Sequence, residues 1–225
     1  MLTDLTRAFG MLSDPTVRRT FLISLGVAVA LLAALFPATS ALVDYAGTSG
    51  YVWVDRVLDV LSLAGTAILA WLLFPVVVAA ILGFLLDSVV AATERRHYPA
   101  LPPARGQPRL ASLVHALGFA ALVLVLNLLA LPLYLVPGLN IPVFLVLNSY
   151  LLGREYGELV LAQRHPLSGL KPLRRRYRAQ LWLSGFITAL LLMIPIVNLL
   201  APVVGSAFAT LRLHRAGASE RTLYR

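Results

Sequence analysis

Two short segments of the chain pair a helix-breaking proline with an asparagine three residues later. These are Pro137 and Asn140 in "LVPGLNIPVF", and Pro195 and Asn198 in "MIPIVNLLAPVVG". A proline interrupts the helical hydrogen-bond ladder, and the next helix begins with free N–H groups at the positive end of its dipole. Such a helix start can bind an anion without a charged side chain. The turns are therefore candidate oxyanion sites, with Gly138 allowing close backbone approach and the two asparagine amides adding donors.

Both turns lie inside stretches without a charged residue, 110–153 and 179–211. In hydrocarbon an unpaired backbone group costs several kcal/mol, so an irregular turn survives only inside protein or beside a water-filled cavity. In one interpretation the turns face such a cavity, and Asn148 on the following arm lines a polar path. In the other, each asparagine caps its own hairpin and nothing binds there.

The chain that must position these turns has the composition of an integral membrane protein. Hydrophobic residues make up 59% of the 225 residues and charged residues 13%, against about 25% charged in soluble domains. We expect a single all-α membrane domain with two long transmembrane helices and two helical hairpins. The expected parts are a cytoplasmic or interfacial segment at 1–19, an uncleaved helix at 20–43, a long helix at 57–92, hairpins at 110–153 and 179–211, and a basic tail at 212–225.

Arm length indicates that the hairpins penetrate only halfway. The 33 residues of 179–211 break near their middle, which leaves arms of ~15 residues, shorter than the ~20 needed for a full crossing. In the other hairpin the outgoing arm, 143–153, is also short, although 110–135 is long enough to span alone, so a full hairpin stays open there. Fourteen positions separate Asn140 from Arg154 and also Asn198 from Arg212, which indicates a repeated unit.

The charge distribution predicts the topology. The formal charge is +9, and basic residues gather in 1–19, 93–109, 154–178 and 212–225, whereas the segment around Asp44, Asp55 and Arg56 is poor in them. The positive-inside rule then places the basic segments in the cytoplasm and the acidic loop outside. The arginines serve either lipid phosphates or an anionic substrate.

Polar residues near the ends of the uncharged stretches have a structural and a functional interpretation. Arg154, Glu155 and Glu158 form a predicted interfacial ion-pair cluster, which anchors a helix end or lines a gate. Asp87 near the end of the second long helix is expected to be interfacial and solvated rather than a proton-coupling carboxylate.

Several function classes have no support in the sequence. The chain has no cysteine, and its histidines, at positions 97, 115, 165 and 214, fit no metal-ligand spacing. Neither a phosphate-binding G-x-x-x-x-G-K-[ST] motif nor a G-x-S-x-G nucleophile motif occurs. We therefore expect no enzyme activity, no metal, no cofactor and no nucleic-acid partner, and His115 is expected to be a hydrogen-bonded or interfacial helix residue.

Over most of its length the chain resembles the CysZ family of bacterial sulfate permeases. The resemblance rests on "PGLNIPVFLVLNSYLLGREYGELV" and "IPIVNLLAPVVG", and more weakly on "DPTVRRTF". It implies a multi-pass inner-membrane protein that admits sulfate, or a related oxyanion, for cysteine biosynthesis by a passive or ion-coupled route. It also implies half-penetrating hairpins and anion contacts at Arg18 and Arg19. We expect membrane lipids as partners and a homo-oligomer; the alternative function is a membrane scaffold or lipid-interacting protein without transport.

Overall fold

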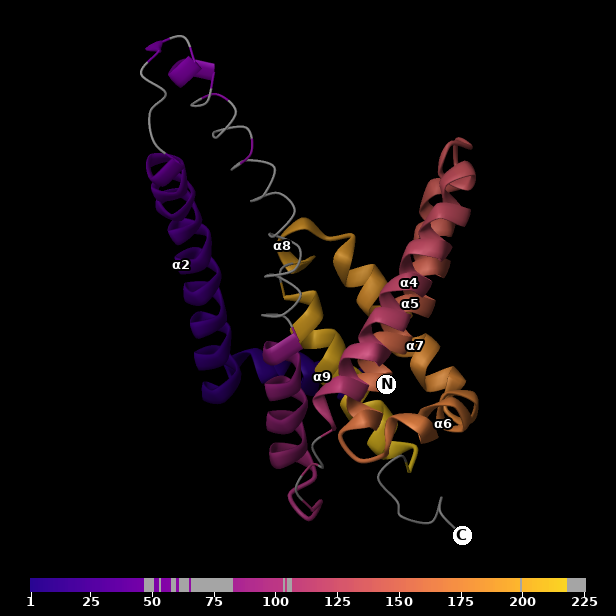
Figure 1. Ribbon diagram of the computed structural model, residues 1–225. Helices are drawn as coiled ribbons and strands as arrows, with labels where there is room; N and C mark the ends of the chain where they lie inside the picture. Colours follow the sequence, from indigo (N-terminus) through magenta and orange to yellow (C-terminus); the bar gives the residue numbers. More distant parts are fainter. Residues whose placement is uncertain are drawn as a thin grey trace. The chain divides into compact units, whose positions relative to one another are not determined.

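The computed structural model describes residues 1–46, 51–52, 54–57, 60, 65, 83–102, 104, 107–198 and 200–217. These residues form helices and turns and contain no strand, so the all-α prediction is confirmed (Figure 1). Residues 83–97 are helical. The other helices are α1 (Leu2–Gly10), α2 (Pro15–Ala46), α4 (Arg109–Tyr134), α5 (Asn140–Ala162), α6 (Leu170–Arg176), α7 (Arg178–Leu192), α8 (Pro195–Asn198) and α9 (Ala201–Arg215), with 3-10 turns η1 (Met11–Ser13) and η2 (Leu167–Gly169).

The chain divides into two compact units. One comprises Met1–Val17 and Leu86–Arg225, and the other comprises Arg18–Leu85. The expected helix at 20–43 lies within α2, a single helix of 32 residues. Most of the expected helix at 57–92, including the position of its proposed kink at Pro75, lies outside the described residues.

The start of α2 follows from the dipeptide Asp14-Pro15. Asp14 Oδ1 accepts a hydrogen bond from the backbone N–H of Thr16 at 2.9 Å, and Pro15, which has no N–H to satisfy, is the first helical residue. This is the usual chemistry of a helix N-terminus. It places Arg18 and Arg19 just after the cap, where both side chains are exposed.

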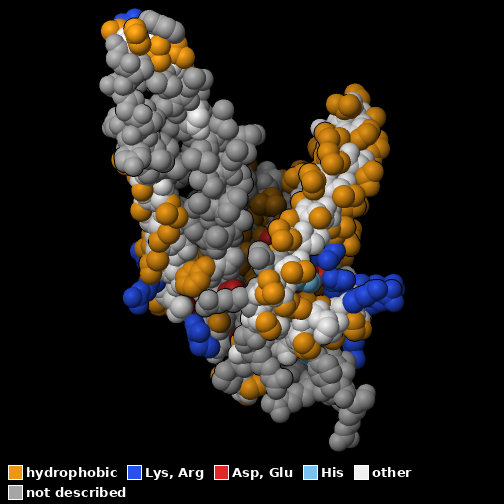
Figure 2. Space-filling view, in the orientation of Figure 1, with side chains coloured by type: hydrophobic (Ala, Val, Ile, Leu, Met, Phe, Trp, Pro, Cys, Tyr) orange, Lys and Arg blue, Asp and Glu red, His pale blue; other side chains and the backbone are white. Residues whose placement is uncertain are grey.

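Helix α4 is the part of the described chain best suited to cross a membrane. It has 26 residues, or ~39 Å at ~1.5 Å per residue. Among the described residues, Leu110–Tyr134 is the one helical stretch whose length and apolar composition suit a span, and almost none of it is buried. Apolar side chains cover this arm in Figure 2; large exposed ones include Leu117, Leu124 and Leu129.

Helix α5 is longer than the expected outgoing arm. It continues past Gly153, through Arg154 and Glu158, to Ala162, and has 23 residues, or ~34 Å. Arginine and glutamate are good helix formers, and a charge with a partner does not end a helix. The α4–α5 hairpin therefore has two long arms, with the Pro137 turn at its far end (Figure 1).

Small residues bring α5 and α7 into close contact. A Cβ atom added to Gly185 would lie 2.8 Å from Cα of Gly153, and one added to Gly153 would lie 2.8 Å from the carbonyl carbon of Leu181. Neither position has room for a side chain. With the buried Ser149, Gly153 and Gly157 recur at every fourth residue, which is the small-residue spacing that lets membrane helices approach closely.

Helices α7 and α9 form a shorter hairpin around α8. Each has 15 residues, the length expected from the position of Pro195, and spans ~22 Å. Helix α9 is the most buried element, with Val204, Ala207 and Phe208 fully enclosed. It packs against α5, α7 and α1, and α1 turns its own buried residues, Asp4 and Ala8, inward.

Candidate functional site

The Pro137 turn has the expected local geometry but not the expected burial. Gly138 has a φ of 85°, a conformation that favours glycine. Asn140 is the first residue of α5, and its side-chain Oδ1 accepts a hydrogen bond from the N–H of Ile141 at 2.9 Å. Its Nδ2 amino group therefore remains as a donor. Residues 135–142 are all exposed, at the end of arms that are each longer than a ~30 Å membrane core.

The Pro195 turn lies directly on the buried core. The backbone N–H of Asn198 donates to the carbonyl of Ile194 at 2.8 Å, and that of Leu200 donates to the carbonyl of Val197 at 2.9 Å. The Asn198 side chain is exposed, whereas Ala201, the first residue of α9, is fully buried. This turn therefore joins a surface asparagine to a buried helix start.

The structure does not assemble the predicted turn residues into one site. The Pro137 turn and α8 lie apart in Figure 1. Asn148 lies about two helical turns along α5 from Asn140, and its Nδ2 donates to the carbonyl of Phe144 at 2.9 Å, so one of its two amide hydrogens is used within its own helix. Arg18 and Arg19 belong to the other compact unit.

Glu158 is the centre of the predicted ion-pair cluster. Its carboxylate is buried, and Oε1 accepts from Nε of Arg154 at 2.8 Å and also from Nη1 of Arg174 on α6. Oε2 accepts from Nε2 of His115 on α4 at 2.7 Å. The cluster therefore joins α4, α5 and α6. Glu155, the other acid expected in it, has an exposed side chain and no ion pair among the described residues.

These contacts decide the protonation of Glu158. Burial alone would raise the pKa of the carboxyl group, because it penalises the charged form. The hydrogen bond from Arg174, the charge of Arg154 and the hydrogen bonds from His115 and Arg154 outweigh burial and hold the pKa below its usual value. Glu158 is therefore a carboxylate at neutral pH.

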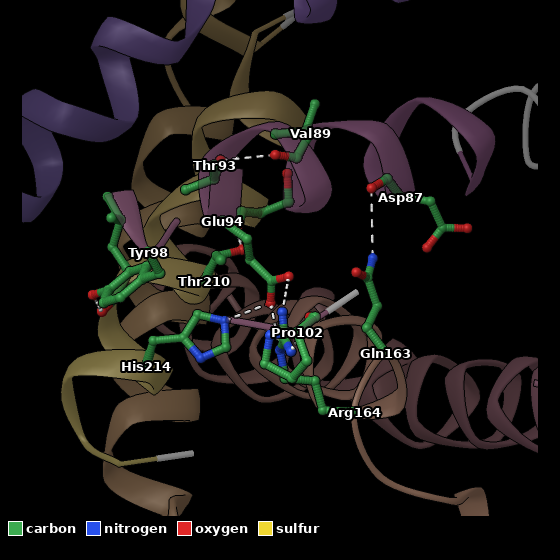
Figure 3. A network of polar contacts seen from close by, with 12 residues as sticks. Asp87, Val89, Thr93, Glu94, Tyr98, Pro102, Gln163, Arg164, Thr210 and His214 are labelled. Carbon is green, nitrogen blue, oxygen red and sulfur yellow. Dashed lines mark hydrogen bonds and ion pairs between the residues drawn. The ribbon is translucent and has the colours of Figure 1, made fainter. Parts of the chain in front are cut away.

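A second buried carboxylate, Glu94, lies at the centre of the network in Figure 3. Arg164 donates to Oε1 from Nε at 3.0 Å and to Oε2 from Nη2, and its Nη1 donates to the carbonyl of Pro102 at 2.9 Å. His214 on α9 contacts Oε1 through Nε2 at 2.6 Å, and the ring of Tyr98 packs edge-on against His214. Burial would raise the pKa of Glu94, but the hydrogen bonds and charges of His214 and Arg164 lower it.

Asp4 on α1 is a third buried carboxylate with basic partners. Its Oδ2 lies 3.4 Å from Nη1 of Arg212, and its Oδ1 lies 2.6 Å from Nη2 of Arg215, both on α9. We call Asp4, Glu94 and Glu158, together with the basic residues that contact them, the ionic base. Hydropathy and spacing did not indicate the roles of Asp4 and Glu94. The sequence feature that could have indicated these roles is that Asp4 and Glu94 are acidic residues within segments that are otherwise rich in basic residues.

The ionic base has the chemistry of a structural anchor and not of a catalyst. Each carboxylate is already engaged with arginine or histidine, so none is poised to accept a proton from a substrate. Within the described residues, no group of three or more histidine, aspartate or glutamate side chains is arranged to hold a metal ion.

Comparison with known proteins assigns the family. Residues 4–202 match the family described as "Sulfate transporter CysZ/Etoposide-induced protein 2.4". No individual curated protein matches the chain. The family is one of transporters rather than enzymes, and it is associated with membranes and with an anionic substrate. Because the match extends over most of the chain, from α1 to the start of α9, the protein belongs to the sulfate transporter CysZ/etoposide-induced protein 2.4 family.

Proposed function

We propose that the protein is a permease of the bacterial inner membrane that admits sulfate or a related oxyanion, and so supplies sulfur for cysteine biosynthesis. The observation that carries this proposal is the match to a sulfate transporter family over residues 4–202. We further propose that the chain is one permease domain, that it contacts membrane lipids, and that it acts as a homo-oligomer through a passive or ion-coupled route.

The ionic base supports a multi-pass topology. The positive-inside rule places four basic segments, 1–19, 93–109, 154–178 and 212–225, on one side of the membrane. Asp4, Glu94, Arg164 and Arg212 come from these four segments in turn, and all of them take part in the ionic base. His214 also contacts Glu94, so the four segments are joined to one another. Segments that bond to one another must lie on the same side, so the ion pairs and the charge rule favour the same arrangement.

In this arrangement the two hairpins differ in depth. Along α5, the Pro137 turn lies ~27 Å from Glu158 at ~1.5 Å per residue, close to the ~30 Å thickness of a membrane core. We therefore propose a full-length hairpin for α4–α5. The arms of α7 and α9, ~22 Å each, suit a half-penetrating hairpin with the Pro195 turn at membrane depth. The two long helices proposed at 20–43 and 57–92 complete the domain.

The proposed route uses donors at three levels. Arg18 and Arg19, exposed on the first turns of α2, attract the anion at the cytoplasmic surface. Asn198 presents its exposed side-chain amide at membrane depth, and Gly138 and Asn140 offer backbone and Nδ2 donors at the far end. Asn148 has one amide hydrogen left for the path between them.

Uptake of labelled sulfate into proteoliposomes tests the proposal. We expect flux above that of empty vesicles, inhibited by thiosulfate or sulfite if these share the route. The double variant R18Q/R19Q should lower the flux about tenfold or more, because two charge-assisted contacts are lost.

The matched control is R7Q/R95Q, which removes the same charge at two exposed arginines elsewhere. Flux no greater than in empty vesicles would contradict the permease function and would leave the alternative, a membrane scaffold or lipid-interacting protein without transport. Equal loss in both double variants would exclude a specific role for Arg18 and Arg19.

A further inference from the structure

A groove on the α5–α6–α7 face of the molecule gathers more positive charge than the structure neutralises. It has a volume of about 500 Å³, within the ~300–1,000 Å³ range of ligand pockets. Figure 2 shows one group of basic side chains at the right of the view, in the region where Figure 1 labels α6. The groove is lined by Arg154, Lys171, Arg174, Arg175 and Arg178, and by no acidic residue.

Only part of this charge is compensated. Glu158 contacts Arg154 and Arg174 through one nitrogen of each guanidinium, which fixes both side chains and leaves their other N–H groups for a further acceptor. Lys171, Arg175 and Arg178 are exposed and form no ion pair among the described residues. Like charges in one concave site repel each other, and a bound anion relieves that repulsion.

The groove also has an amphipathic wall. Tyr150 and Trp182 line it beside the cations, and these residues are 45% and 46% exposed. Trp182 is held in place by stacking on Phe186, with ring centroids 5.6 Å apart. Each combines an apolar ring with one polar group, the phenol hydroxyl of tyrosine or the indole N–H of tryptophan. The groove therefore offers arginine forks for an oxyanion next to apolar surface.

We propose that this groove, here called the basic groove, is a binding site for a tetrahedral oxyanion group, either free sulfate or phosphate or the phosphate of an anionic lipid headgroup. Arginine forks match such oxygens bidentately. Lys171, Arg174 and Arg175 follow the i, i+3, i+4 spacing on α6, which places their donors on one face of the helix. The proposal does not depend on transport, because it concerns equilibrium binding at one surface.

The test measures binding to the full chain purified in a neutral detergent. In the first arm, sulfate and inorganic phosphate are titrated at constant ionic strength by calorimetry, with the tryptophan emission as a second readout. In the second arm, native mass spectrometry compares retention of added phosphatidylglycerol with that of phosphatidylcholine. Binding in the first arm identifies a free anion, and selective retention in the second identifies a lipid phosphate. Either result supports the site only if the groove variants weaken the binding and the control variant does not.

The groove variant is R175Q/R178Q, and its charge-matched control is R7Q/R95Q. We expect the groove variant to weaken binding about tenfold or more, since two charge-assisted contacts are lost, and the control to bind like wild type. K171Q provides a second groove variant should R175Q/R178Q not fold, and W182F should abolish the fluorescence change while the calorimetric signal persists. The proposal is overturned if neither arm shows binding, or if groove and control variants weaken it equally.

Discussion

At the scale of single residues, Glu158 is the position where one substitution should have the largest effect. Changing it to glutamine removes the carboxylate shared by Arg154, Arg174 and His115 and leaves these partly buried side chains without their common acidic partner. We expect a loss of roughly 3 kcal/mol in unfolding free energy, the lower end for a broken buried pair because the basic partners are partly exposed. Thermal unfolding in detergent measures this loss.

The neighbouring acid provides the control. Glu155 lies on the same helix but has an exposed side chain without an ion pair in the described chain, so E155Q should change stability by at most ~0.5 kcal/mol. Equal losses in the two variants would contradict the role given to Glu158.

Glu94 and Glu158 should also make stability depend on pH. The folded chain lowers the pKa of both below their usual value of 4.5. A carboxyl with a lowered folded pKa contributes stability that is fully present above its unfolded pKa and is lost as the pH falls through the folded value. We therefore expect the melting temperature to fall as the pH drops below about 4.5. The double variant E94Q/E158Q should have a flatter profile between pH 3 and 6.

At the scale of helices, the crossing of α5 and α7 depends on the absence of two side chains. G185A puts a methyl group against backbone atoms of α5, which cannot change rotamer to make room. We expect a loss of roughly 3 kcal/mol, the upper end for overpacking, measured by thermal unfolding. The control is G118A in α4, where an added Cβ meets nothing within 4 Å. Because alanine is the better helix former, G118A should be neutral or stabilising by up to about 1 kcal/mol.

Helices α5, α7 and α9 show what the sequence can and cannot predict about element lengths. The lengths of α7 and α9 could be read from the position of Pro195, because a proline must interrupt the helical ladder. The end of α5 could not, because Arg154 and Glu158 look like a solvated exit when their partners are unknown. Ser149, Gly153 and Gly157 carried a readable signal for close packing that hydropathy alone does not reveal.

For the candidate site, the sequence predicted the local geometry of single residues better than it predicted which residues lie close together in the fold. The positive φ of Gly138 and the exposure of Arg18 and Arg19 agree with local rules about glycine and helix starts. The separation of the two asparagine turns and the convergence of Arg154 with the α6 arginines depend on tertiary packing. No spacing rule reaches across such distances in the chain.

At the scale of the whole molecule, the absence of cysteine in the sequence makes topology directly testable. We expect L139C, at the tip of the α4–α5 hairpin, to react with a membrane-impermeant maleimide from the outer face. S168C, in η2, should react only in inside-out vesicles, and I194C, at the Pro195 turn, from neither side. If L139C is protected from the outside although it reacts in detergent, the full-length hairpin is wrong.

The contact of α1 with α9 has a consequence for biogenesis. Asp4 leaves the ribosome 208 residues before its partner Arg212, and Arg215 follows three residues later. Helix α1 therefore keeps the face that carries Asp4 and Ala8 uncovered until α9 has been synthesised. Chains that stall late in synthesis would present that uncovered face to the quality-control proteases of the cell.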